Sequence, residues 1–322
     1  MWVTSSLAKA LTPTAVALGN FDGLHLGHQR VIQPVLNFAC ASHGYSTVVT
    51  FNPHPQEFFT GQRRALLTPL NEKVEELVRL GVEQLVLLPF DRELATLSPQ
   101  QFVEKILVQQ LGSRQISVGE DFRFGNQRSG TATDLQAIAA SFGIPVTIVG
   151  LHTCEGDACG GQPERISSSS IRQALEQGDL QRAKVLLGRP YTLTGCVVKG
   201  QQLGRTIGFP TANIELPPQK FLPRQGVYAV RVFMCPTSSL LGVMNIGSRP
   251  TVNGTHPSVE VHLLDWSGDL YGKTITVQPE KFLRPEQKFA SLEALKAQIQ
   301  ADCAIARSVL TLEQLIGHER TN

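Results

Sequence analysis

The chain has 322 residues, of which 42% are hydrophobic and 17% charged, and its formal net charge is +2. These values are ordinary for a globular protein, and a length near twice ~150 residues favours two domains. A charge so close to balance provides no field that would predict nucleic-acid binding. Small anionic ligands need only local positive groups, so this balance does not count against them, and we expect neither a nucleic acid nor a membrane as a partner. Since no apolar stretch reaches ~18 residues and no secretory leader is visible, we expect a cytoplasmic location.

The six cysteines form no C-x-x-C pair, and the two nearest, Cys154 and Cys159, lie in a glycine-rich loop. We therefore expect free thiols. The sequence does not determine the oligomeric state, so a homo-oligomer stays open.

The first half is organised around residues 19–28, GNFDGLHLGH. An apolar run at residues 14–18 predicts a buried strand before this stretch, and the spacing at 29–36 predicts a helix after it. A helix N-terminus offers N–H groups and partial positive charge to an anion, and glycines let a phosphate approach the backbone. His25 and His28 can then donate to phosphate oxygens from one side of the turn. A structural histidine in a glycine-rich turn is the alternative, and the full motif favours nucleotide phosphate binding.

Apolar runs and amphipathic segments alternate through the rest of this half. The pattern predicts strands at residues 46–51, 84–89, 115–119 and 145–149, and helices at 72–80, from Pro99 with Ser98 as N-cap, and at 132–142. Such alternation predicts a parallel sheet with helices on both faces, which binds ligands at the carboxyl ends of its strands.

Distinctive residues follow three of these strands. Two prolines at 53 and 55 predict a rigid, non-helical turn. Phe122 and Phe124 flank Arg123 in a loop bounded by glycines, which suits a flat aromatic ligand carrying phosphate, although packing against a neighbouring loop is the alternative. Residues 166–172, ISSSSIR, predict a helix start that cradles a triphosphate, whereas a simple serine N-cap would need only one serine.

A boundary near residues 187–191 divides the chain into domains 1–187 and 188–322. Short runs broken by glycine and proline follow, and they predict a small antiparallel β-barrel with strands at 191–198, 226–233, 241–246, 258–264 and 274–277. A closing helix should pack on this barrel through one apolar face: Phe289, Leu292, Leu295, Ile299, Cys303, Ala306 and Leu310.

Polar residues of the second half suit phosphoryl transfer. Glycines at 200, 204 and 208 predict a flexible flap, and Thr211 with Asn213 offers oxygen ligands of the kind that Mg²⁺ accepts. Alternation in VEVHLL places Glu260 and His262 on one face of a strand. Glu260 can accept a hydroxyl proton there, or it can be an ordinary solvent-facing residue.

The H-x-G-H turn resembles the signature of the nucleotidyltransferase superfamily. Together, GNFDGLHLGH, FNPHP, GEDFRFGNQRSG and ISSSSIR, followed by GRTIGFPTAN, GVYA, GVMNIGSRPTV, VEVHLLDWSGDLYG and FLRPEQKFASLEALKAQI, resemble the bifunctional bacterial riboflavin kinase/FMN adenylyltransferase family over residues 19–307. Only the loop at 154–163 is less typical. The resemblance implies an α/β fold: an N-terminal Rossmann-like parallel-sheet nucleotidyltransferase domain and a C-terminal antiparallel β-barrel with a closing helix.

The resemblance implies that the first half joins FMN to ATP, giving FAD and diphosphate, with no protein nucleophile. His25 and His28 would donate to the triphosphate, Asn20 would orient it, and Arg172 would hold the leaving diphosphate. The implied ATP contacts also include Gly19, Phe21, Asp22, Gly23, Ser167 and Ser168, and the implied flavin contacts are Phe51, Asn52, His54, Asp121, Phe122 and Phe124.

By the same resemblance, the second half phosphorylates riboflavin with ATP, giving FMN and ADP. Glu260 would be the general base, and Thr211 and Asn213 would hold Mg²⁺ and the ATP phosphates. Further implied ATP contacts are Gly204, Arg205, Gly208 and Pro210, and implied flavin contacts are Trp266 and Arg284.

Two other interpretations of these motifs exist. In the first, one module has kept its motifs only as a scaffold, so one of the two products would never form. In the second, the chain binds nucleic acid, because class I tRNA synthetases share a related H-x-G-H turn. That function would require a basic stripe and an anticodon-binding region, and the sequence shows neither.

Overall fold

The computed structural model describes residues 1–154, 163–200, 203–235, 238–251 and 254–319. The chain forms two compact units, Met1–Ser168 and Ser169–Asn322. The units therefore divide at the start of α7 (Ser168–Gln177), whereas the predicted domain boundary follows α8 (Leu180–Leu187). The boundary at 187/188, which separates the two predicted functional domains, stays a prediction.

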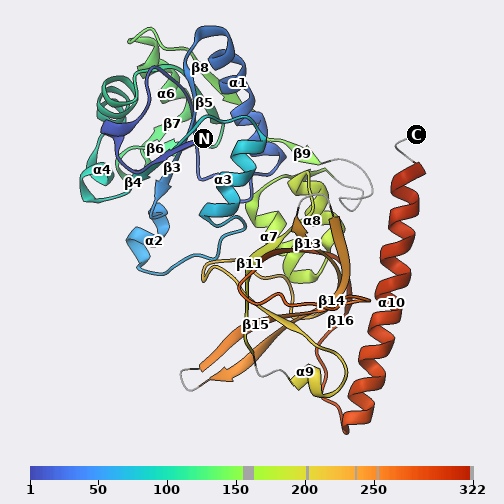
Figure 1. Cartoon of the computed structure of the whole chain (residues 1–322). Helices are drawn as coiled ribbons and strands as arrows, with labels where there is room; N and C mark the ends of the chain where they lie inside the picture. The colour runs from blue at the N-terminus through green and yellow to red at the C-terminus, as the bar shows by residue number, and fades with distance from the viewer. Residues whose placement is uncertain (155–162, 201–202, 236–237, 252–253, 320–322) are drawn as a thin grey trace. The chain divides into compact units, whose positions relative to one another are not determined.

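The first unit is built on a six-stranded sheet in the order β1-β4-β3-β2-β5-β8, with every neighbouring pair parallel (Figure 1). Its strands are β1 (Trp2–Thr4), β2 (Thr14–Leu18), β3 (Tyr45–Asn52), β4 (Gln84–Pro89), β5 (Ser113–Gly119) and β8 (Val146–Val149). Its helices are α1 (Leu26–Ser42), α2 (Pro55–Thr60), α3 (Leu70–Arg79), α4 (Arg92–Thr96), α5 (Pro99–Gln101), the π-helical η2 (Phe102–Gln110) and α6 (Ala132–Ala140). Short elements complete the unit: η1 (Leu7–Lys9), η3 (Asn126–Arg128), and the antiparallel pairs β6 (Arg123–Phe124) with β7 (Gly130–Thr131) and β9 (Thr153–Cys154) with β10 (Glu164–Arg165).

Strand β2 is buried along its whole length because helices cover both faces of the sheet. Ala15 and Ala17 belong to the core beneath α1, whereas Val16 and Leu18 belong to the core with η2 and α6. A continuous apolar run is the sequence expected of a strand in this position. The predicted parallel sheet is confirmed.

Strand β2 also lies at the point where the strand order reverses, because its neighbours are β3 on one side and β5 on the other. In an open parallel sheet, the crevice at such a point, outside the carboxyl ends of the strands, is the usual place for a ligand. The GNFDGLHLGH stretch leaves β2 at this end and leads into α1.

The prediction of a non-helical turn after β3 is wrong. Helix α2 begins at Pro55, with His54 as its N-cap and a capping box to Glu57. Proline is tolerated at the first helical position, because its missing N–H would have no partner there anyway. The two prolines therefore end the strand and start a new helix.

The second unit is a closed antiparallel barrel in the order β11-β12-β15-β14-β13-β16. Its elements are α7, α8, β11 (Leu193–Val198), α9 (Leu203–Thr206), β12 (Ala212–Glu215), β13 (Gly226–Cys235), β14 (Ser238–Thr251), β15 (Gly254–Leu263), β16 (Thr274–Arg284) and α10 (Leu292–Glu319). The predicted barrel is confirmed, and the sequence missed only its short strand β12.

Helix α10 packs along the outside of the barrel (Figure 1). Cys303, Ala306 and Leu310 share a buried cluster with barrel residues such as Val227 and Ala229. The predicted apolar face is wrong at its beginning, because Leu292 is 49% exposed. Among the described residues, the helix contacts β13, β14 and β16.

The expectation of free thiols is wrong for Cys154, which is disulfide-bonded. The other described cysteines, Cys40, Cys196, Cys235 and Cys303, are free.

Candidate active sites

The turn after β2 has an unusual backbone. Phe21 and Leu24 have φ angles of 47° and 46°, and Gly23 has 92°. Residues other than glycine rarely adopt φ angles in this left-handed region, because this conformation costs them about 1–2 kcal/mol each. Phe21 and Leu24 are only 1% exposed. The burial of these two side chains offsets the strain and fixes the shape of the turn.

Hydrogen bonds from a distant segment hold the same turn. The Thr68 backbone N–H donates to Asp22 Oδ1 at 3.1 Å, and the Gly23 N–H donates to Thr68 Oγ1 at 2.8 Å. Ser168 Oγ donates to the Asp22 carbonyl at 2.8 Å. The Asp22 carboxylate is thus a buried structural group, which sequence reasoning had described only as an ATP contact.

The carbonyl of Asn20 accepts two more hydrogen bonds, from Thr50 Oγ1 and Lys73 Nζ, both at 3.1 Å. Thr50 lies on β3 and Lys73 on α3. Sequence reasoning missed Thr68 and Lys73, because both lie in what it took to be an ordinary amphipathic helix and its approach.

His25 and His28 come together as predicted. His25 is the N-cap of α1, and its Nδ1 accepts a 3.3 Å hydrogen bond from the His28 backbone N–H. In its neutral form, the His25 ring would therefore carry its proton on Nε2, where it can donate. The two rings stack with centroids 3.6 Å apart. Gly27 permits this arrangement, since a Cβ there would lie 3.2 Å from the His25 ring.

The His28 ring is held in its neutral form. Burial lowers its pKa well below the usual value, and the charges of His25 and Lys73 lower the pKa further. Its buried Nδ1 has no hydrogen-bond partner among the described residues. A buried polar atom of this kind fits a site that is completed by a ligand.

The FNPHP segment lies at the carboxyl end of β3. His54 Nδ1 accepts from the Gln56 N–H at 3.1 Å, and burial, followed by the charge of Arg64, lowers the His54 pKa. Asn52 is exposed. Sequence reasoning missed the aromatic cluster that continues from Phe51: it also contains Phe58, Phe59 and Phe90. Phe59 is 71% exposed, and the adjacent pair of phenylalanines was the available signal.

The two phenylalanines of the loop after β5 pack against each other, and Phe124 also packs against Phe102. Phe124 is only 3% exposed and packs at 5.5 Å from the Phe102 ring, so the packing alternative describes it. Phe122 stacks on Phe124 with centroids 5.8 Å apart and is half-buried. The exposed Asp121 is ion-paired with Arg165.

Arg172 belongs to the second unit, where its guanidinium lies 5.7 Å from the Phe221 ring centroid. Ser167 is half-buried in the first unit. The prediction that Arg172 acts with the H-x-G-H turn stays a prediction.

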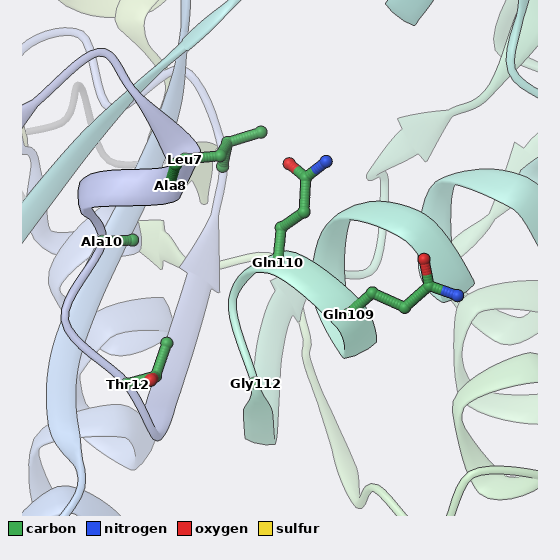
Figure 2. Close-up of a pocket in the computed structure, with 7 residues that line it drawn as sticks. All are labelled: Leu7, Ala8, Ala10, Thr12, Gln109, Gln110 and Gly112. Carbon is green, nitrogen blue, oxygen red and sulfur yellow. The ribbon is translucent and has the colours of Figure 1, made fainter.

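A pocket of the first unit lies at the opposite edge of the sheet, beside the starts of β2 and β5. Figure 2 shows Gln110, at the end of η2, on the side of the segment that contains Leu7 and Ala8, whereas the Gln109 side chain points away from that segment. This pocket has no charged lining residue, and it lies at the wrong ends of the strands to serve the histidine pair.

In the barrel, Glu260 is central to a group of polar residues. It pairs in register with Asn213 of β12 on one side and with Asn245 of β14 on the other. Thr211 Oγ1 donates to Glu260 Oε2 at 3.2 Å. Glu260 is half-buried and partnered, which favours the functional interpretation over a solvent-facing residue.

Glu260 and His262 both contact the segment that contains Pro210 and Thr211. Nδ1 of His262 lies 2.8 Å from the Pro210 carbonyl. The prediction that the two side chains share one face of β15 is confirmed, with Val259 and Val261 buried on the other face.

The three glycines of the predicted flap differ from one another. A methyl group at Gly200 would overlap the Asn213 carboxamide, and one at Gly204 would overlap the Phe209 carbonyl. Gly208 has open space around it and a φ of 90°. The Arg205 side chain lies outside the described residues. Two of the glycines therefore allow close approach of other groups.

The two predicted flavin contacts of this unit have neighbours of their own. Arg284 forms an ion pair with Asp302 of α10 at 2.8 Å, and its guanidinium lies 5.7 Å from the Phe289 ring centroid. Trp266 is half-buried and lies so close to Gly268 that a Cβ there would be 2.7 Å from its ring. Flavin contact by either residue stays a prediction.

Separate family models match the two parts of the chain. The family model for riboflavin kinase matches residues 187–310, and that for FAD synthetase matches residues 7–163. The bifunctional riboflavin kinase/FMN adenylyltransferase of Escherichia coli K12 is 43% identical over 92% of this chain and 93% of its own length. The chain belongs to the bifunctional riboflavin kinase/FMN adenylyltransferase family. Its activities are those of a riboflavin kinase and an FMN adenylyltransferase.

Other members of the family are similar over nearly their whole length. The protein of Haemophilus influenzae is 40% identical over 93% of this chain and 95% of its own, and that of Bacillus subtilis is 37% identical over 90% of each. A crystal structure described as a macrolide-efflux protein from Streptococcus pneumoniae matches with a TM-score of 0.81 at 32% identity, over 95% of this chain and 98% of that one. Efflux belongs to that description alone; within the described ranges of this chain, we find no helix with the length and apolarity to span a bilayer.

Proposed function

We propose that the histidine pair at the start of α1 is the ATP site for FMN adenylylation. The observation that carries this assignment is the stacked His25–His28 pair at the point where the strand order reverses. An oxygen of the FMN phosphate attacks the α-phosphorus of ATP. The bond from that phosphorus to the bridging oxygen breaks, and diphosphate leaves with the electron pair.

The protein contributes positioning and charge stabilisation to this reaction. His25 donates from Nε2 to the triphosphate, and the stacked His28 ring contacts the same phosphates. Asn20 and the backbone of residues 19–23 form the turn around the triphosphate. Ser167, Ser168 and Arg172 hold the departing diphosphate in this proposal.

The FMN ring needs an apolar surface near the same strand ends. The exposed Phe59, supported by Phe58 and Phe90, supplies one, next to Phe51, Asn52 and His54 at the end of β3. We assign the flavin of the adenylylation step to this surface, with Phe122 and Asp121 as further contacts and Phe124 as their packing support.

In the barrel, we assign the general base to Glu260. Its carboxylate accepts the proton of the riboflavin 5′-hydroxyl as that oxygen attacks the γ-phosphorus of ATP, and ADP leaves. Thr211 Oγ1 holds the carboxylate in position at 3.2 Å. The remaining assignments follow the motif positions: Gly204, Arg205, Gly208 and Pro210 near ATP, and Trp266 and Arg284 near the flavin.

The donors of Thr211, Asn213 and Glu260 are hard oxygen atoms, which suit Mg²⁺. Within the described residues, no group of three or more histidine, cysteine, aspartate or glutamate side chains forms a metal cage. Thr211 and Asn213 therefore fit an ion that takes most of its ligands from ATP phosphates and water. When bound, Mg²⁺ neutralises phosphate charge. We place the enzyme, with its ATP and flavin substrates, in the cytoplasm.

The test follows flavins by chromatography after mixing the protein with riboflavin, ATP and MgCl₂. The wild type should form FMN and then FAD. His28→Ala should stop at FMN with adenylylation reduced about 10²- to 10³-fold. Glu260→Gln should lose phosphorylation by about 10²- to 10⁴-fold and still adenylylate added FMN. Each variant is the folding control for the other. Retained FAD synthesis in His28→Ala would overturn the first assignment, and retained phosphorylation in Glu260→Gln the second.

A further inference from the structure

Lys73 is a buried lysine that donates a hydrogen bond to the turn leading to the histidine pair. It lies on α3, and its side chain is only 8% exposed. Lysine is rarely buried, because its ammonium group loses hydration that few partners can replace. Among the described residues, the one hydrogen-bond acceptor of Nζ is the Asn20 carbonyl, at 3.1 Å. The positions of α3 that pack inward include Leu77, so an apolar side chain at position 73 would also suit the helix.

The charge of Lys73 interacts with residues that follow β2 and with a residue that follows β3. Electrostatic interactions connect it with Asp22 and His28 of the first strand end and with His54 of the second. Burial lowers the Lys73 pKa, while Asp22 opposes that shift and favours the ammonium form. His28 is faced by His25 and Lys73, and His54 by Arg64, Glu57, Asp22 and Lys73.

We propose that Lys73 is a positioning residue for adenylyl transfer: its buried ammonium group fixes the Asn20 carbonyl and holds a positive charge against His28, where the phosphates of ATP and FMN meet. The inference rests on the assignment of the histidine pair as the ATP site. Two anionic substrates must approach each other in this reaction, and a fixed cation near the junction lowers their repulsion.

A hydrogen bond alone does not account for a lysine at this position. Thr50 Oγ1 donates to the same carbonyl at the same distance, 3.1 Å, without any charge. The property that Thr50 lacks is the positive charge. Thr50→Val is therefore a matched control, because it removes one neutral hydrogen bond to Asn20 and leaves the charge in place.

The experiment compares Lys73→Met and Thr50→Val in the full-length protein. Adenylylation is measured with added FMN, and riboflavin phosphorylation in the same samples reports on the second unit. The pKa of His28 is measured by NMR from its ring Cε1–H, which is assigned by its loss in His28→Gln. Lys73→Met should reduce kcat/KM for adenylylation about 100-fold, leave phosphorylation unchanged and raise the His28 pKa toward 6.5. Thr50→Val should leave the His28 pKa unchanged and reduce adenylylation less.

Equal losses in the two variants with no change in the His28 pKa would overturn the proposal, since Lys73 would then act only as a hydrogen-bond donor. Wild-type adenylylation in Lys73→Met would also overturn it. Neither result touches the ATP-site assignment, because that fails only if His28→Ala keeps making FAD. The two inferences can therefore fail separately.

Discussion

The two candidate sites of this chain are built in different ways. The turn of the first unit is buried, has strained φ angles at Phe21 and Leu24, and is tied down by hydrogen bonds from Thr50, Thr68 and Lys73. In the second unit, Thr211, Asn213 and Glu260 are half-buried and placed mainly by the register of β12 with β15.

The two sites therefore obtain their accuracy in different ways. A buried turn with several partners keeps one geometry before any substrate arrives, which favours pre-organised donors for phosphate. Half-exposed side chains on the paired strands of the barrel have freedom to adjust when substrate and metal bind. Mutations around the first site should therefore affect activity and stability together, whereas mutations in the second should affect mainly activity.

Thr68→Val gives the largest effect and tests the first half of this comparison. It removes the 2.8 Å hydrogen bond that the Gly23 N–H donates to Thr68 Oγ1 and leaves the backbone bond from the Thr68 N–H to Asp22 in place. We expect adenylylation to fall about 100-fold, because the turn is displaced, and the first unit to lose about 1–3 kcal/mol of unfolding free energy.

The chain has two tryptophans, Trp2 in the first unit and Trp266 in the second. In a Trp266→Phe background, urea unfolding followed by fluorescence therefore reports on the first unit alone. Riboflavin phosphorylation serves as the control in the protein that keeps Trp266 and should be unchanged. Full adenylylation in Thr68→Val would show that the turn does not depend on this partner.

Gly200→Ala tests the second half. Its methyl group would overlap the Asn213 carboxamide, so Asn213 must rotate away from its position beside Glu260. We expect riboflavin phosphorylation to fall about tenfold, with adenylylation and unfolding free energy nearly unchanged, because the half-exposed side chain has room to move.

Gly272→Ala is the matched control for Gly200→Ala. Gly272 has a φ of 73° with nothing within 4 Å of an added Cβ, so the substitution costs about 1 kcal/mol of strain and does not reach Asn213. It should lower stability slightly and leave phosphorylation intact. The reverse pattern, with Gly200→Ala active and unstable, would show that the second site is as rigid as the first.

The local sequence pattern predicted much of this arrangement. Strands β2 and β4 have the predicted limits, because unbroken apolar runs are typical of strands buried on both faces. The two histidines lie at the predicted junction of strand and helix, because a glycine-rich turn marked it. In these cases the information lies within a few residues.

The parts that sequence reasoning missed depend on distant contacts. Thr68 meets Asp22 across 46 positions, and Lys73 meets Asn20 across 53. A lysine in an amphipathic pattern predicts a solvated face, and only tertiary packing buries this one. Likewise, the packing of Phe124 against the Phe102 ring could not be predicted from the loop sequence alone. Strand β12 was missed because only four residues, Ala212–Glu215, separate the flap from the next turn.

The smallest effect concerns pH and again separates the two units. The folded-state pKa of His28 lies well below 6.5, first because of burial and then because of His25 and Lys73. Below about pH 6.5 the unfolded chain binds a proton that folded His28 resists, so the first unit should lose stability as pH falls from 6.5 through the lower folded value. One such group contributes at most about 1.4 kcal/mol per pH unit, and nothing above pH 7.

In urea unfolding followed through Trp2, His28→Gln should flatten this acid slope. The part of the slope due to His54 and His152 should remain, because their pKa values are also lowered, mainly by burial. The slope of the second unit, followed through Trp266 in a Trp2→Phe background, should not change. An unaltered slope in the first unit would mean that the buried turn carries its histidine without this cost, and the contrast in rigidity between the two sites would then rest on the hydrogen bonds of Thr50, Thr68 and Lys73 alone.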